Sequence, residues 1–214
     1  MAQDTFFIAD LHLGHDERNG RGGIIRHAHR PFSCIEDHDE ALIKNFNDTV
    51  PKKALTYIVG DFAWKNHNKY LSRLNGKKIL ILGNHDRMPQ ETLRNFTSVH
   101  ERLSRRIDGQ IIVMDHYCGL VWDRSCHGSW QLYGHSHGRI AERDNVPRCD
   151  VGVDVWNYKP VPWEVLKMKL GKRTRDRRCG SGEIVDLEAN VERNRKENIA
   201  ILRGWDRNVI SIST

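Results

Sequence analysis

The sequence lacks the hydrophobic segments that membrane insertion requires. No apolar run in its 214 residues approaches the roughly 20 residues needed to cross a bilayer. The short apolar run near the N-terminus has no basic segment before it, so we interpret it as a strand and not as a signal peptide. We therefore expect no membrane partner. A folded domain is expected because 38% of the residues are hydrophobic and 29% are charged.

The cysteine content excludes two further classes of protein. There are five cysteines, an odd number, and no Cys-x-x-Cys pair occurs. Neither a disulfide framework nor a cysteine-rich zinc site is expected, and reduced thiols are typical of the cytoplasm, which is the predicted location. The net charge of +6 favours anionic partners. The 12 histidines are more informative, because several lie close to an aspartate or to another histidine, as is typical of metal or acid–base sites.

The hydrophobic pattern predicts an α/β fold. Strands are expected over 5–9, 55–59 and 79–82, with a helix before each of the last two, and this alternation favours parallel strands. The first helix would begin at Ser33, because Ser-Cys-Ile-Glu fits a capping box that ends at Glu36.

The second half of the chain has a different pattern. Asp108-Gly109 predicts a hairpin between strands over 99–107 and 110–114. A further strand is expected over 151–155, and a helix over 163–170 that ends at Gly171.

The composition divides the chain into a main domain, residues 1–170, and a basic appendage, residues 171–214, that packs on it. The division rests on residues 172–178, which hold five basic residues and one acid. Residues 187–203 have weak helical periodicity, and Gly204 would end that helix.

Aspartate, asparagine and histidine residues follow the predicted strands at the point where each ends. Ligands of open α/β sheets bind beyond the carboxyl ends of the strands, so these side chains are expected to meet on one rim. They are Asp10, His12, Asp61, Asn84, His85, His116, His135 and His137. Alternate residues of extended backbone point the same way, so the first two would share one metal. Oxygen and imidazole ligands without thiolate favour manganese, iron, zinc or a related first-row ion.

These blocks resemble those of the calcineurin-like metallophosphoesterases, and most of all those of the short bacterial and phage members. The blocks are Asp10-Leu11-His12, Gly60-Asp61, Gly83-Asn84-His85-Asp86, His116 and Gly134-His135-Ser136-His137. The subgroup is indicated by Gly14-His15, Arg30-Pro31-Phe32 and Val151-Gly152-Val153-Asp154. Five blocks in order, each after an apolar strand, are highly specific. The resemblance extends from residue 5 to about residue 170.

The resemblance implies a four-layer α/β/β/α sandwich that holds two divalent metal ions, with Mn²⁺ preferred and Fe, Zn or Ni as alternatives. One ion would be held by Asp10, His12, Asp61 and His137. The other would be held by Asp61, Asn84, His116 and His135, with Asp61 as the bridge. The ions would generate a hydroxide that attacks phosphorus. His85 would stabilise the phosphoryl charge or protonate the leaving group, and Asp86 would orient His85.

Several positions leave two interpretations open. His127 is an alternative donor to His116, because Cys118 stands where a proline is frequent in the family. His15 either contacts the substrate or braces its loop. Arg30 either binds phosphate or forms a structural salt bridge.

Two further features have a binding interpretation and a structural one. Basic residues of the 16–30 loop would form a wall for a nucleotide or nucleic acid, or would lie in a solvated segment. Trp122 and Trp130 would stack a base or pack in the core.

We therefore predict a phosphoesterase that acts on a phosphate ester, with nucleotide-like phosphodiesters preferred over monoesters. Its partner would be a phosphorylated small molecule or nucleotide, with nucleic acid as the alternative. A nuclease or end-processing enzyme on the same site is the second hypothesis. A non-catalytic binding module is the third, and the full set of ligands argues against it. The oligomeric state is not predicted.

Overall fold

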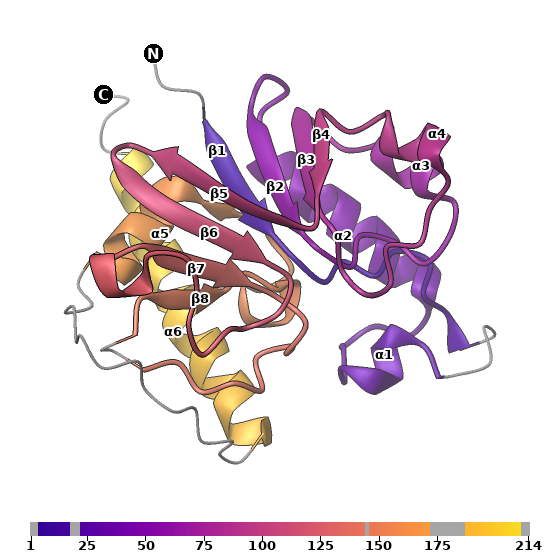
Figure 1. The fold of residues 1–214 in the computed structure, drawn as a ribbon. Helices are drawn as coiled ribbons and strands as arrows, with labels where there is room; N and C mark the ends of the chain where they lie inside the picture. Colours follow the sequence, from indigo (N-terminus) through magenta and orange to yellow (C-terminus); the bar gives the residue numbers. More distant parts are fainter. Residues whose placement is uncertain (1–3, 18–21, 144–145, 172–186, 211–214) are drawn as a thin grey trace.

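The computed structural model describes residues 4–17, 22–143, 146–171 and 187–210, which form two β-sheets with helices on both sides (Figure 1). The five-stranded sheet has the order β4-β3-β2-β1-β9, in which only β9 is antiparallel to its neighbour. Its strands are β1 Thr5–Ile8, β2 Leu55–Val59, β3 Lys77–Ile81, β4 Ser98–His100 and β9 Val161–Pro162. The α/β sandwich predicted from the sequence is confirmed.

The second sheet has four strands in the order β5-β6-β7-β8. Its strands are β5 Arg102–Ile107, β6 Gln110–Asp115, β7 Trp130–Tyr133 and β8 Arg148–Asp150. The first pair is the antiparallel hairpin, and the other pairs are parallel. The helices are α1 Ile24–His27, α2 Ile35–Thr49, α3 His67–Leu71, α4 Gln90–Leu93, α5 Trp163–Leu170 and α6 Leu187–Ile210, with 3₁₀ turns at Ser125–His127 and Val153–Val155.

The two faces of the five-stranded sheet bury alternate residues of the same strands. Phe6, Ile58 and Leu80 pack on one face with the apolar side of α2. Phe7 and Tyr57 pack on the other face, in a cluster that joins this sheet to β6, β7, β8 and α5. Because both faces are buried, the strands are almost continuously apolar, as is usual for parallel strands between two layers.

Four predicted boundaries are wrong. The strand over 99–107 is two strands in different sheets, separated at the exposed Glu101, where no glycine or proline marks the break. Helix α2 is capped by Cys34 and not by Ser33, because the Cys34 Sγ accepts the Asp37 amide at 3.5 Å. Strand β8 precedes the predicted strand over 151–155, where Val153–Val155 form a 3₁₀ turn whose buried valines imitate a strand pattern.

The fourth difference concerns α6, which continues through Gly204 to Ile210. An isolated glycine inside a helix costs about 1 kcal/mol and does not end it. This helix packs on α5 and on the Val153–Val155 turn. The predicted Asp144-Asn145 turn and the basic run over 172–178 lie outside the described residues. Of the helices that the structure describes, none combines the length and hydrophobicity needed to cross a bilayer.

Lys169 joins α5, α6 and the segment before β8 through a buried ion pair. Its Nζ lies 3.0 Å from the Glu142 carboxylate, and the two side chains are 2% and 4% exposed. The same Nζ donates to Asn198 Oδ1 at 2.7 Å. We predict that Lys169→Met lowers the free energy of unfolding by about 3–5 kcal/mol, because it removes the cation that compensates the buried Glu142 carboxylate.

Urea denaturation followed by circular dichroism measures this effect. The matched control is Lys167→Met on the same helix, where the lysine pairs with Asp108 and Glu164 at the surface. Its loss is expected to change the free energy of unfolding by less than about 1 kcal/mol. Equal stability of the two variants would contradict the role assigned to Lys169.

Candidate metal centre

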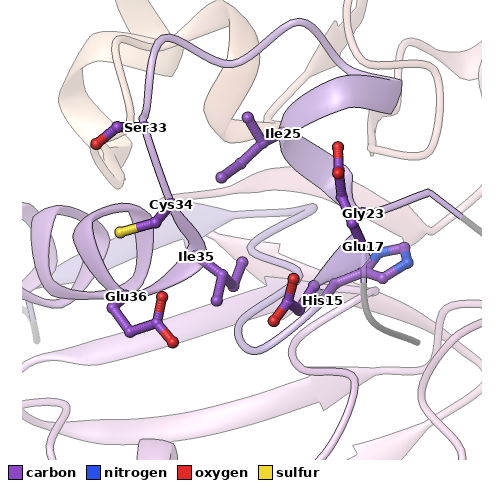
Figure 2. Close-up of a pocket in the computed structure, with 9 residues that line it drawn as sticks. His15, Glu17, Gly23, Ile25, Ser33, Cys34, Ile35 and Glu36 are labelled. Atoms are coloured by element: carbon purple, nitrogen blue, oxygen red, sulfur yellow. The ribbon is translucent and has the colours of Figure 1, made fainter. Parts of the chain in front are cut away.

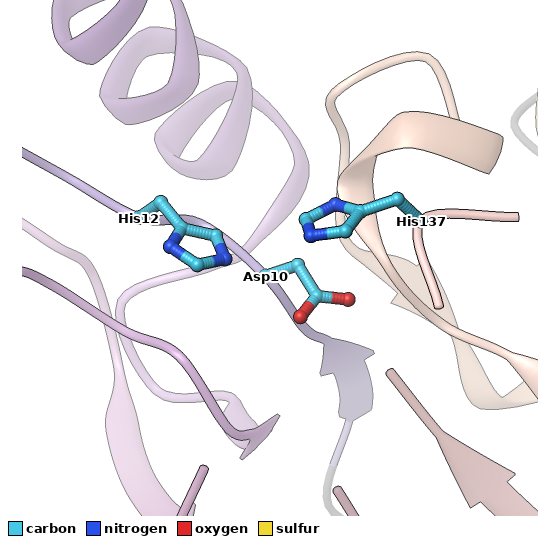
Figure 3. A group of neighbouring side chains, drawn as sticks. All are labelled: Asp10, His12 and His137. Atoms are coloured by element: carbon cyan, nitrogen blue, oxygen red, sulfur yellow. The ribbon is translucent and has the colours of Figure 1, made fainter. Parts of the chain in front are cut away.

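The structure brings the polar residues at the strand ends together in three overlapping groups. Within each group the ligand atoms lie within 4.8 Å of one another. The groups are Asp10, His12 and His137; His12, Asp61 and His85; and Asp61, His116 and His135. Figure 3 shows the first group, in which the rings of His12 and His137 face each other beside the Asp10 carboxylate. Five imidazole rings and two carboxylates thus share one rim.

Asp61 lies between the other candidate ligands. Its Oδ2 is 3.3 Å from His12 Nε2 and 3.4 Å from His116 Nε2. Each ligand lies about 2.0–2.2 Å from a bound ion, so two ligands of one ion are about 3–4 Å apart. The His116 Nε2 also lies 3.1 Å from Asn84 Oδ1. The spacing around Asp61 therefore fits a carboxylate shared by two ions.

His12 gives an independent test of whether a cation fits. It is 3% exposed, and neither ring nitrogen has a hydrogen-bond partner among the described residues. A buried polar atom without a partner is unfavourable, and a metal ion would satisfy Nε2. Burial, followed by the charge of Arg30, lowers the pKa of His12 well below its ordinary value. The ring is consequently neutral, which is the form that binds metals.

Five of the candidate ligands have left-handed backbone. The φ angles are 58° at Asp10, 52° at His12, 56° at Asp61, 64° at His135 and 48° at His137. Such conformations cost about 1–3 kcal/mol each and occur where the surrounding structure enforces them. The predicted reason for pairing Asp10 with His12, an extended backbone, is therefore wrong. They share a group because the chain turns at both residues.

Two glycines allow the ligands to approach the backbone. A Cβ on Gly60 would lie 2.1 Å from His116 Nδ1, and a Cβ on Gly83 would lie 2.3 Å from Asp61 Oδ1. The His116 ring therefore covers Gly60, where its Nδ1 donates to the Val59 carbonyl at 3.0 Å. This bond turns Nε2 toward Asp61 and fixes the tautomer, as is usual for metal-binding histidines.

The Asp10 carboxylate is fully buried and accepts the His135 amide at 3.0 and 2.9 Å. Burial raises its pKa to about 7, although His137 and His116 oppose this shift. The protein alone thus stabilises this negative charge incompletely. A cation at the rim would supply the missing stabilisation.

Asp86 does not have the predicted position. Its carboxylate accepts the backbone amides of Asp61, Phe62 and Gly83 at 2.8–2.9 Å, and burial raises its pKa to about 6. It therefore positions the strand ends that hold Asp61, whereas the prediction had it orient the His85 ring. His85 itself is partly exposed, with Nε2 3.9 Å from Asp61 Oδ2 and its amide bonded to Asp61 Oδ1.

Arg30 lies behind the candidate ligands, and this placement corrects its predicted contact with substrate. Its guanidinium donates to both oxygens of Asp154 at 2.8 Å and to the carbonyls of Asp10 and Leu11. All three nitrogens have protein partners, so the structural salt bridge is the correct alternative. Asp154 also accepts His137 Nδ1 at 2.7 Å, which leaves Nε2 of that ring for a metal.

The role of Asp154 was missed from the sequence. Burial opposes its ionisation, but Arg30 and His137 hold its pKa well below the usual range. The only sequence signal was its place at the end of the Val151–Asp154 block. Its partner Arg30 is 124 residues away, a distance at which local patterns carry no information.

His15 stacks on Trp64, with ring centroids 4.0 Å apart and planes at 5°. Its ring is 5.4 Å from His12 and 5.8 Å from His85, so it lies at the rim. Burial lowers its pKa to about 4, with a smaller effect of His85. This position is compatible with both predicted roles. Trp64 was missed because no motif contains it.

The structure decides between the two interpretations of His127 and of Trp130. His127 is exposed on the 3₁₀ turn that precedes β7 and belongs to none of the metal groups of the described residues. It lies by Arg106 and Arg124, whereas His116 faces Asp61. Trp130 packs against Trp163, as the core alternative predicts.

The described part of the 16–30 loop does not form a basic wall. It borders a cavity of about 500 Å³ between His15 and the start of α2 (Figure 2). The described side chains that line it include Asp16, Glu17 and Glu36 and no arginine, so it does not fit an anion. Arg18 and Arg21 lie outside the described residues.

Comparisons with known proteins give relatives of similar length. No family model matches the chain. The uncharacterized protein MJ1445 of Methanocaldococcus jannaschii is 28% identical over 179 residues, covering 78% of this chain and 91% of that protein. The gene 66 protein of Mycobacterium phage D29 is 27% identical over 202 residues, covering 77% of this chain and 94% of that protein.

The fold is also found in a solved structure. The protein of unknown function AQ665 from Aquifex aeolicus has a TM-score of 0.59 at 21% identity and covers 78% of this chain and 98% of its own. A novel archaeal phosphodiesterase has a TM-score of 0.43 at 19% identity, and the match covers 70% of this chain and 82% of that protein. The fold assignment rests on the former and on the sheet topology. The chain has the α/β sandwich fold that its resemblance to the calcineurin-like metallophosphoesterases implied.

Proposed function

We propose that this protein is a metal-dependent phosphoesterase of the calcineurin-like metallophosphoesterase type. The observation that carries the proposal is the sharing of His12 and Asp61 among three groups of potential ligands. A single structural ion would need only one such group. Overlapping groups fit two ions side by side, the arrangement that many phosphoester hydrolases use.

The proposed ligands divide into two sets. Asp10, His12, Asp61 and His137 would hold one ion, and Asp61, Asn84, His116 and His135 the other. Divalent ions held there would supply Lewis acidity toward phosphate oxygens and would lower the pKa of a water molecule. Carboxylate, amide and imidazole donors without thiolate fit Mn²⁺, Fe, Zn or Ni.

His85 is proposed as the catalytic acid. It is the one histidine of the three groups not assigned as a ligand, its side chain is 34% exposed, and its Nε2 faces Asp61. A proton on this ring would pass to the oxygen of the leaving group. Its backbone is fixed by the bond from its amide to Asp61 Oδ1 at 2.9 Å, which ties the acid to the shared ligand.

An exposed aromatic ring beside the centre, followed by two exposed apolar residues in its loop, supports an organic ester as the substrate. Tyr117 is 50% exposed, and its ring lies 4.7 Å from that of His135. Leu120 and Val121 in the same loop are 63% and 64% exposed. These side chains would contact the organic groups of a phosphodiester such as a nucleotide ester.

We predict that Asp61→Ala removes both ions, because it deletes the ligand that both share. Chelated protein is reloaded with Mn²⁺, and the bound metal is counted by mass spectrometry after gel filtration. Asp48→Ala is the control, since Asp48 is exposed and pairs with Lys44 on the surface of α2. Two ions in the control and none in Asp61→Ala are expected. Full metal content in Asp61→Ala would exclude the bridging role.

We predict that His85→Ala keeps its metal but lowers kcat by about 10²–10⁴-fold, the range for a positioned acid–base group. Hydrolysis of bis-p-nitrophenyl phosphate by the Mn²⁺-loaded protein measures this change. His127→Ala is the control and should retain wild-type turnover, because His127 lies away from the centre. Normal turnover by His85→Ala with full metal content would show that another group supplies the proton.

A further inference from the structure

A cavity of about 290 Å³ opens beside the metal centre, close to the volume of roughly 300 Å³ at which small-molecule pockets begin. His137, a proposed ligand, forms part of its wall. The remaining wall comes from the end of α1, from the segment after β7 and from one face of α6. The cavity is distinct from the acidic one beside α2, because the two share none of their lining residues.

The polar side chains of this cavity are mainly cationic. Arg139 and Arg195 line it together with His29, and Glu192 is the acid among the lining residues. The Arg139 Nη2 donates to the His27 carbonyl at 3.0 Å. Across the described residues, no carboxylate pairs with the Arg139 guanidinium. Arg195 Nη1 is 4.0 Å from the Glu192 carboxylate, too far for a hydrogen bond, and its Nη2 makes a long contact of 3.5 Å with the Tyr158 hydroxyl.

Helix α6 is fixed relative to the metal ligands. Arg195 Nε donates to the carbonyl of Asp154 at 3.1 Å, and Asp154 is the residue that holds His137. Asn198 is fully buried and donates to the carbonyl of Val155 at 2.8 Å. The arginine on α6 is therefore held at a set position relative to His137. A mobile C-terminal segment could not hold Arg195 at a fixed position.

We propose that this cavity binds a second phosphate group of the substrate while the ester phosphate lies at the metal centre. The inference rests on the proposed function and narrows it to a nucleotide-sized ester that carries an additional phosphate. Two guanidinium groups against one carboxylate give the cavity a net positive charge, and guanidinium groups bind phosphate through paired, charge-assisted bonds. Because His137 borders both places, one substrate molecule can occupy them together.

The test compares two substrates that both release p-nitrophenol, so their hydrolysis is followed by the same signal. They are the p-nitrophenyl ester of thymidine 5′-phosphate and the same ester with a 3′-phosphate. With the Mn²⁺-loaded full chain, kcat/KM is expected to be at least about tenfold higher for the 3′-phosphorylated ester, as a charge-assisted bond provides. Arg139→Gln and Arg195→Gln should each lower this ratio toward one. Arg94→Gln is the control, since Arg94 is exposed beyond α4 and should keep the wild-type ratio.

Two outcomes overturn the proposal. One is a wild-type ratio of one or less, and the other is a ratio that both cavity variants retain. Arg139→Gln carries the test if Arg195→Gln misfolds, because Arg195 also bonds to Asp154. Failure of the proposed function is recognised separately, as absent turnover of bis-p-nitrophenyl phosphate. In that case, calorimetry tests whether the cavity binds a phosphate group. Thymidine 3′,5′-bisphosphate should bind at least about tenfold more tightly than thymidine 5′-phosphate. Equal affinity overturns the assignment.

Discussion

The burial of acidic side chains at the ends of the central strands is the constraint on which the rest of the structure depends. Asp10 is fully buried and Asp61 is 2% exposed, and each carboxylate accepts a backbone amide while three or more imidazoles surround the pair. Carboxylates in such a place need compensating charge, because burial disfavours the ionised form. The protein provides amides and histidines but leaves the Asp10 pKa near 7. Divalent cations at the proposed centre would complete this balance, and the proposed phosphoesterase function rests on them.

Holding this arrangement costs free energy, because it strains the backbone and restricts the side chains. Five of the proposed ligands occupy left-handed backbone, and Gly60 and Gly83 leave room for the side chains of His116 and Asp61. Behind the ligands, Asp86 binds three backbone amides around Asp61, while Asp154 and Arg30 form a buried pair that fixes His137. This pair also reaches α6, since Arg195 bonds to the carbonyl of Asp154. The C-terminal helix thus joins the same network and contributes to the wall of the second cavity.

The sequence predicted those parts of the molecule that local patterns encode. Strand β2 and helix α5 have the expected bounds, because an apolar run and a terminating Gly171 mark them. The residues assigned as ligands meet because each lies within four residues of the end of a strand, so the strand ends indicated where they would gather. Contacts between distant segments could not be predicted. Arg30 pairs with a residue 124 positions away, Trp64 covers His15 without belonging to a motif, and Arg139 and Arg195 come together only through the packing of α6. The break at Glu101 was also missed, because sheet membership is set by packing and leaves no mark on the strand pattern.

Anomalous diffraction from crystals of the Mn²⁺-loaded protein tests the central claim most directly. The account predicts two manganese peaks about 3.5–4 Å apart, one on each side of the Asp61 carboxylate, the separation found in two-metal hydrolases. The first should lie by His12 and His137 and the second by His116 and His135. A single peak in fully loaded crystals, or two peaks without Asp61 between them, would contradict the shared-carboxylate centre on which the proposed function rests.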